Sequence, residues 1–201
     1  MYIETLSKFN ETKFNIWSSF LKKCGLEPDL SVSQTVLLWD DDTLIATGSR
    51  QDNLLKCIAV DESRQGEGHT ATIITSLRKE AFNEGYNHLF LYTKPENKTM
   101  FSSLFFYPVA QTDKVLLMEN RKDGINSFLD TLLVKQSSKI TGACIMNCNP
   151  FTLGHRYLIE TAAKECDLLY IFVVSEDKSF FSFNDRFQMV KLGTSDIPNV
   201  I

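Results

Sequence analysis

Residues 140–163 read ITGACIMNCNPFTLGHRYLIETAA, and this stretch decides the fold of the second half of the chain. Residues 140–146 are small and apolar, which predicts a buried strand. The next residues, Asn147-Cys148-Asn149-Pro150, are predicted to form a turn, because proline ends regular strand pairing and asparagine favours turns. Residues 154–164 then predict an amphipathic helix, whose apolar side consists of Leu158, Ile159, Ala162 and Ala163.

The junction between this turn and the helix has the properties of a phosphate site. The first N–H groups of a helix lack acceptors within it, and the helix dipole is positive there. Gly154 allows a phosphate close to the backbone, His155 can donate a hydrogen bond, and Thr152 can add a hydroxyl donor. A structural turn with a capping threonine and a packed histidine is the alternative. Because Asn, Pro, Thr, Gly and His occur together here, we favour the phosphate site.

The residues after this helix complete a strand–helix–strand unit. The apolar run Asp167–Val174 predicts a second buried strand, parallel to the first and joined to it by a right-handed crossover. Ser175–Lys178 then lies at the same sheet edge as the Asn147 turn, where ligands of open α/β sheets bind. A further helix begins at 184–186, with Phe187, Met189, Val190 and Leu192 on it, and residues 197–201 predict the start of a third strand.

The segment NCNPFTLGHRYLIETAA resembles the T/HxGH signature of the nucleotidyltransferase superfamily, and it is similar to the sequences of citrate lyase ligases. The resemblance extends over essentially the whole chain. It implies a catalytic role for His155 and Thr152, with Mg²⁺ assisting and no protein metal site. The ATP-binding residues that it implies are Asn147, Asn149, Pro150, Phe151, Thr152, Gly154, His155 and Arg186. For Arg186, a salt bridge with Asp185 or a neighbouring residue is the alternative.

The first half of the chain alternates helices and strands. Apolar spacing predicts helices over 8–25, 70–83, 98–106 and 123–136, and strands over 35–39, 44–47, 54–60, 88–92 and 115–118. Ile73, Ile74, Leu77, Ala81 and Phe82 are predicted on the buried side of the second helix. The polar residues 136–139 break the pattern before it restarts. We therefore expect two domains, residues 1–136 and residues 140–201.

A glycine-rich turn, Gln65-Gly66-Glu67-Gly68-His69, follows the strand over 54–60. Together with the element order, it resembles the GNAT acyltransferases, whose Q/R-x-x-G-x-G/A turn binds the pyrophosphate of coenzyme A. Gly66 and Gly68 match that motif, whereas Ser63 stands where Gln or Arg is usual. The resemblance implies that Gln65, Gly66, Glu67, Gly68 and His69 bind a CoA-derived arm; a helix start that needs glycine is an equally weighted alternative.

Acetyl transfer itself has less support from these residues. Tyr107 falls near the tyrosine that protonates the departing thiolate in GNAT enzymes, although an aromatic residue in such a cluster is more often core. The expected fold class is therefore α/β: a GNAT-like mixed α+β domain, followed by the first part of a Rossmann-like nucleotidyltransferase domain.

Composition narrows the functional classes. The net charge is −4, with no long basic run, which argues against a nucleic-acid binder. Neither a membrane-spanning run nor a secretory signal is visible, so we predict a cytoplasmic protein. The five scattered cysteines form no zinc pattern and predict reduced, partly buried thiols, of which Cys148 is expected to react with thiol reagents without a catalytic role.

The resemblance implies an acid–thiol ligase that forms AMP. Acetate and ATP would give acetyl-AMP, and the CoA-derived thiol of the citrate lyase acyl carrier protein would then accept the acetyl group. The alternatives are an acetyl-CoA-dependent GNAT acetyltransferase, a phosphopantetheine or nicotinamide mononucleotide adenylyltransferase, and a non-catalytic module that binds the carrier protein. No KMSKS-like loop appears before Ile201, so we expect a C-terminally truncated chain whose activity the sequence leaves open.

Overall fold

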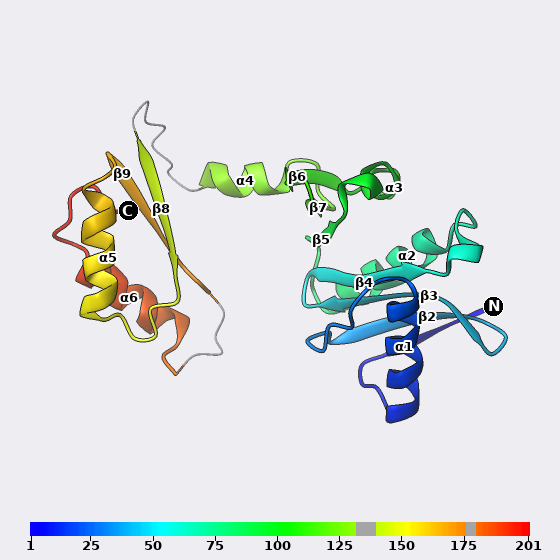
Figure 1. Cartoon of the computed structure of the whole chain (residues 1–201). Coiled ribbons are helices and arrows are strands. Elements are labelled where there is room, and N and C mark those ends of the chain that lie inside the picture. The colour runs from blue at the N-terminus through cyan, green and yellow to red at the C-terminus, as the bar shows by residue number, and fades with distance from the viewer. Residues whose placement is uncertain (132–139, 176–179) are drawn as a thin grey trace. The chain divides into compact units, whose positions relative to one another are not determined.

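The structure, a computed structural model, describes residues 1–131, 140–175 and 180–201. The chain divides into two compact units, Met1–Leu132 and Leu133–Ile201 (Figure 1). The predicted domain boundary at 137–139, and the end of the helix predicted over 123–136, lie outside the described residues.

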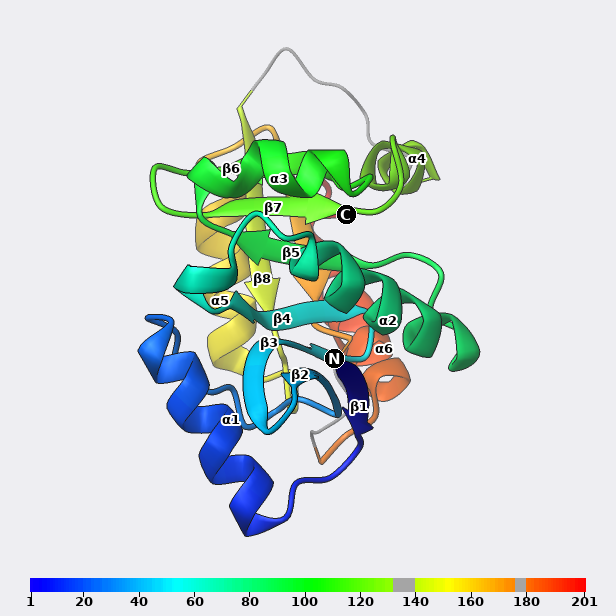
Figure 2. The ribbon, with the colours of Figure 1, turned by 90° about the vertical axis from the view of Figure 1, so that its right-hand side faces the viewer.

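Unit 1 is built around a seven-stranded sheet in the order β1-β2-β3-β4-β5-β7-β6, which can be followed in Figure 2. Only β4 and β5 pair in parallel; the other neighbours are antiparallel. In chain order the elements are β1 (Tyr2–Leu6), α1 (Glu11–Lys23), β2 (Gln34–Asp40), β3 (Thr43–Gln51), β4 (Leu54–Val60), the short 3-10 helix η1 (Glu62–Arg64), α2 (His69–Asn83), β5 (Phe90–Thr93), η2 (Pro95–Asn97), α3 (Lys98–Ser103), β6 (Tyr107–Gln111), β7 (Leu116–Glu119) and α4 (Gly124–Thr131).

Helices cover both faces of this sheet, and the alternation along β2 explains why. Val36 and Leu38 belong to the apolar cluster that contains α2 and α3, whereas Leu37 and Trp39 belong to the cluster that contains α1. Since successive side chains of a strand point to opposite faces, this strand is buried on both. The predicted order of strand, glycine-rich turn, long helix, strand and short helix is confirmed as β4, α2, β5 and α3.

Two strands and one side chain depart from the sequence-based prediction. The edge strands β1 and β6 were not predicted, because β1 has little buried apolar alternation and β6 contains Pro108. Proline is tolerated at sheet edges, where no partner needs its missing N–H. The placement of Phe82 on the buried side of α2 is wrong, since this ring is 68% exposed.

The strands β4 and β5 diverge, and this divergence creates the main cavity of unit 1. Their parallel pairing is limited to Leu54 with Phe90 and Leu55 with Leu91. The register between β3 and β4 shifts between Thr47 and Ser49, and Cys57 in β4 has a positive φ of 50°. Such a bulge bends a strand away from its neighbour. The carboxyl-terminal parts of β4 and β5 therefore leave a gap.

Unit 2 contains the predicted strand–helix–strand. The strands β8 (Thr141–Met146) and β9 (Leu168–Val173) pair in parallel along their whole length, which confirms the prediction. The helices α5 (Leu153–Ala163) and α6 (Phe183–Gly193) share a core with them, made of Met146, Cys148, Ile159, Ala163, Leu169 and Val190. Val200 forms a parallel bridge with Leu169, so the predicted third strand begins beside β9.

The apolar side predicted for α5 is only partly correct, and the apolar residues of α6 divide between core and surface. Ile159, Ala163 and Val190 are buried, but Leu158 is 52% exposed and Leu192 is 72% exposed. Among the described residues, no helix is long and apolar enough to cross a membrane.

Candidate functional site

The turn between β8 and α5 holds His155 in one defined state. The backbone N–H of Thr152 donates to His155 Nδ1 at 3.1 Å, and Thr152 Oγ1 lies 2.8 Å from the same nitrogen. A nitrogen that accepts from an amide carries no proton, so the ring proton of the neutral imidazole is on Nε2. The ring also stacks on Phe151 at 6.0 Å. His155 is thus positioned from two sides and retains Nε2 as a donor.

The entrance to α5 is open to a ligand. Within the described parts of the chain, no acceptor is assigned to the amides of Leu153 and Gly154. A Cβ added to Gly154 would meet only Thr152 Oγ1, at an ordinary 3.7 Å. The fold therefore does not require glycine at this position, while close approach of a phosphate to the backbone would require it.

Arg186 is completely buried, which the sequence did not indicate. It donates at 2.8 Å to the carbonyl oxygen and Oδ1 of Asn147 and to the carbonyl oxygen of Val174, and at 3.1 Å to that of Phe181. The guanidinium thus joins the ends of β8 and β9 to the start of α6. The contact of Arg186 with phosphate stays a prediction, and the buried guanidinium is already held by these protein acceptors.

The other predicted residues of the turn also have partners in the protein. Asn149 Oδ1 accepts from the N–H of Phe181 at 3.1 Å, so Asn149 shapes the turn. The ring of Phe151 packs against Gly193 of α6, and Pro150 follows a cis peptide bond. All five cysteines lie in the described ranges and none forms a disulfide. The side chain of Cys148 is buried and burial raises the pKa of its thiol, which disfavours the predicted reaction with thiol reagents.

Unit 1 contains a cavity of about 750 Å³ in the gap between β4 and β5. Four of the five residues predicted to bind a CoA-derived arm line it, namely Gln65, Gly66, Gly68 and His69. Glu67 does not line the cavity, and its carboxylate contacts Arg64 and His69. Tyr107 lines a separate cavity of about 220 Å³, so it is not placed to protonate a thiolate in the larger one.

The glycine-rich turn forms part of the lining of this cavity, through Gln65, Gly66, Gly68 and His69. Gly66 and Gly68 have φ angles of +86° and +83°, which only glycine adopts without strain. Across residues 66–70, all of them described, no intramolecular acceptor is assigned to the backbone N–H groups. A run of unpaired amides at the start of a helix is a concave anion site.

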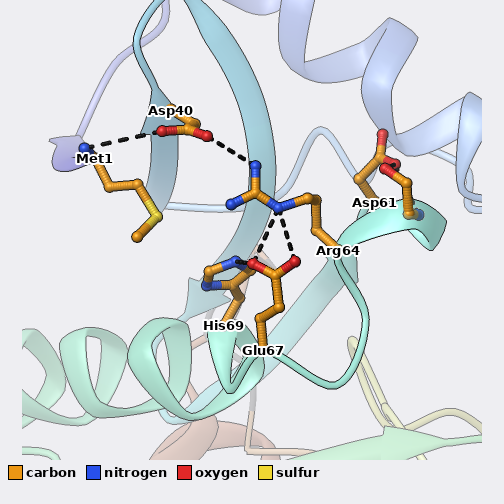
Figure 3. A network of polar contacts seen from close by, with 7 residues as sticks. Met1, Asp40, Asp61, Arg64, Glu67 and His69 are labelled. Carbon is orange, nitrogen blue, oxygen red and sulfur yellow. Dashed lines mark hydrogen bonds and ion pairs between the residues drawn. The ribbon is translucent and has the colours of Figure 1, made fainter.

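Side chains outside the predicted motif fix this turn at both ends (Figure 3). Asp61 accepts from Lys23 Nζ at 2.5 Å and from the N–H of Ser63 at 3.1 Å. Arg64 pairs with two carboxylates: its Nη1 lies 2.8 Å from Asp40 Oδ2, and its Nε lies 3.0 Å from Glu67 Oε2. The pairing of Asp40 with Arg64 could not be predicted from the sequence, since 24 positions separate them and no local pattern links them.

Asp61 should make the stability of unit 1 depend on pH in acid. Its hydrogen bond with Lys23, followed by those from Ser63, lowers the pKa of Asp61 from 3.8 to about 2. A carboxyl whose pKa is lower in the folded state stabilises it above the unfolded pKa, and this contribution is lost as pH falls through the folded pKa. As the pH is lowered from about 4 to about 2, we expect the denaturant concentration at the unfolding midpoint of unit 1 to decrease. In Asp61→Asn, which keeps the capping oxygen but not the charge, the fall should be shallower; an identical profile would contradict this assignment.

One family model and several curated proteins match the sequence of this chain. Residues 141–201 match the citrate lyase ligase C-terminal domain. The [citrate [pro-3S]-lyase] ligase of Klebsiella pneumoniae is 40% identical over 183 residues, which is 90% of this chain and 54% of the relative. That of Haemophilus influenzae is 37% identical over 205 residues, covering 100% of this chain and 60% of the relative. The chain therefore spans a little over half the length of these curated relatives.

Solved structures match unit 1. Escherichia coli ElaA superimposes with a TM-score of 0.53 at 14% identity, covering 60% of this chain and 100% of ElaA. An aminoglycoside 6'-N-acetyltransferase complexed with coenzyme A gives 0.51 at 14% identity, covering 59% of this chain and 96% of the enzyme. At such identities these matches show the fold alone, which is the GNAT fold. By sequence over nearly its whole length, the chain is a homologue of the citrate lyase ligases, with a GNAT-fold first unit and the start of their C-terminal domain as its second.

Proposed function

We propose that this chain carries two substrate sites of an ATP-dependent ligase. The entrance to α5 binds the phosphates of ATP, and the cavity of unit 1 receives the CoA-derived arm of the citrate lyase acyl carrier protein. Acetate would be activated as acetyl-AMP and transferred to the thiol of that arm. The observation that carries the proposal is the open start of α5, where free amides, Gly154 and the Nε2–H donor of His155 occur together.

The proposed chemistry places charge where these donors lie. Attack of acetate on the α-phosphate expels pyrophosphate, so negative charge grows on the bridging and β-phosphate oxygens. His155 Nε2–H and the amides of Leu153 and Gly154 would stabilise that charge, which is the most effective use of preorganised donors. Thr152 would act by fixing the ring of His155, through the 3.1 Å bond from its amide. No group of three or more metal-binding side chains occurs within the described residues, so Mg²⁺ would arrive bound to the nucleotide.

The cavity of unit 1 fits the arm in two respects. Beyond Leu55, β4 lacks a strand partner on the side of β5, so its backbone can pair with the amides of a pantetheine arm. The free amides of residues 66–70 would bind the diphosphate at the other end of the arm. The acetyltransferase of the same fold that was solved with coenzyme A supports this assignment.

Hydrogen exchange tests the two sites separately. At short labelling times, ATP with Mg²⁺ should slow exchange within residues 140–160, and coenzyme A should slow it within residues 61–72. Protection in the wrong segment, or none at saturating ligand, would overturn the corresponding site. The measurement can be made on this chain and on a protein with the full length of its relatives.

Gly154→Ala should separate binding from stability. In a helix, alanine is favoured over glycine by up to about 1 kcal/mol, and the added methyl meets no close atom, so the free energy of unfolding should not fall. ATP affinity should fall about tenfold, because one charge-assisted bond from the backbone is obstructed. Calorimetric titration and urea unfolding measure the two quantities.

Gly193→Ala is the matched control. A Cβ at Gly193 would clash with the ring of Phe151, so this variant should be destabilised. Unchanged ATP affinity in Gly154→Ala would contradict a phosphate at this turn.

A further inference from the structure

The glycine-rich turn of unit 1 carries a carboxylate at its centre, which is unexpected for an anion site. Glu67 lies between Gly66 and Gly68, which line the cavity, and its side chain is 45% exposed. A negative charge beside a diphosphate would weaken binding. The surroundings of Glu67 decide whether the turn can still bind an anion.

Glu67 is engaged by two basic side chains (Figure 3). Arg64 Nε lies 3.0 Å from both carboxylate oxygens, and His69 Nε2 lies 3.1 Å from Oε2. The hydrogen bond from Arg64, followed by a weaker one from His69, lowers the pKa of Glu67. The carboxylate therefore stays ionised and paired.

Arg64 also connects the turn to the sheet. Its Nη1 donates to Asp40 Oδ2 at 2.8 Å, at the end of β2. Asp40 in turn lies 4.0 Å from the amino group of Met1. A planar guanidinium can hold both carboxylates in fixed directions, which a lysine cannot do.

We propose that Arg64 is a positioning residue for the proposed CoA-arm site: it neutralises Glu67 and ties the turn to β2, so that the amides of residues 66–70 converge on the diphosphate. The inference rests on the proposed function of this cavity. Because Arg64 lies in the cavity lining, a direct contact with the ligand would be its obvious role. We assign it instead to the protein carboxylates of Asp40 and Glu67. Ser63, which the motif aligned with the usual Gln or Arg, bonds to Asp61 instead.

A double-mutant cycle distinguishes these tasks, with coenzyme A as the probe in calorimetric titration of the whole chain. Arg64→Gln should weaken binding about tenfold, because Glu67 keeps only its contact with His69 and its charge beside the diphosphate is no longer neutralised by the guanidinium. In Arg64→Gln/Glu67→Gln the affinity should return to within about threefold of wild type, since the charge to be neutralised is gone. Arg78→Gln is the control for net charge, because Arg78 is outside the cavity lining and its guanidinium donates to Leu104 O at 3.4 Å.

Ligand-free NMR spectra provide a second readout. The amide resonances of Gly66 and Gly68 should shift in Arg64→Gln and not in Arg78→Gln. If the double variant binds as weakly as Arg64→Gln, Arg64 contacts the ligand itself and the inference is overturned. Unshifted resonances in Arg64→Gln would overturn it as well. Failure of the wild-type chain to bind coenzyme A would instead overturn the proposed arm site, while the spectra would still test the positioning.

Discussion

Replacing His155 by alanine should lower ATP–pyrophosphate exchange by a factor of about 10²–10³ while unit 2 stays folded. The imidazole is half-buried at the entrance to α5, and its Nε2–H is the donor proposed for the departing pyrophosphate. Removing one preorganised donor from a developing charge raises the barrier by about 3–4 kcal/mol. The exchange is assayed with acetate, ATP and Mg²⁺ in a protein with the full length of the relatives; ATP binding is measured in this chain as well.

Two variants make the result specific. Tyr157→Phe changes an exposed residue on the same helix and should leave exchange unaltered. His155→Gln retains an N–H donor on a side chain of similar reach, and should recover part of the loss. If His155→Ala exchanged at the wild-type rate, the assigned role of the imidazole would be refuted.

Arg186→Leu should destabilise unit 2 by about 3–5 kcal/mol, because it leaves several buried acceptors without a donor. The side chain is 0% exposed; Asn147 loses two 2.8 Å bonds from its Nη1, and Val174 loses one. Urea unfolding, monitored through the NMR signals of β8 and β9, measures the change in the free energy of unfolding of unit 2. Arg186→Lys should be intermediate, since one ammonium group cannot reach all of these acceptors.

Arg156→Leu serves as the control for loss of an arginine from the same unit. Arg156 is partly exposed and pairs with Asp196 and Glu160 at the surface, so its loss should cost much less. A different result for Arg186→Leu would change the role assigned to Arg186. If Arg186→Leu kept the stability of unit 2 but lost ATP affinity, the guanidinium would be a phosphate ligand, as the family resemblance implied.

Local patterns were sufficient for much of unit 2 and for the centre of unit 1. The apolar runs of β8 and β9 are short, continuous and bounded by turn residues, so their strand character depends little on the rest of the chain. Gly66 and Gly68 identified the turn before α2 because a positive φ restricts the residue type at those positions. The segment from Thr152 to His155 identified the entrance to α5 for a similar reason: cap residues act over three or four positions.

The remaining features needed contacts between distant segments. The edge strand β1 has too little buried surface to signal itself, and it exists because β2 offers it a partner. Whether an arginine faces solvent or lies in the interior depends on acceptors elsewhere in the chain. Arg186 finds them at Asn147, 39 positions away, and Arg64 finds one at Asp40, 24 positions away.

By itself, the sequence therefore determined which residues form the two turns and which chemistry their amides, glycines and histidine offer. Only the tertiary structure decided how those groups are held. It fixed the tautomer of His155, opened the cavity where β4 and β5 diverge, and buried Arg186. The physical reason is that composition and spacing act over one or two turns of chain, whereas burial and charge pairing are properties of segments that meet only after folding.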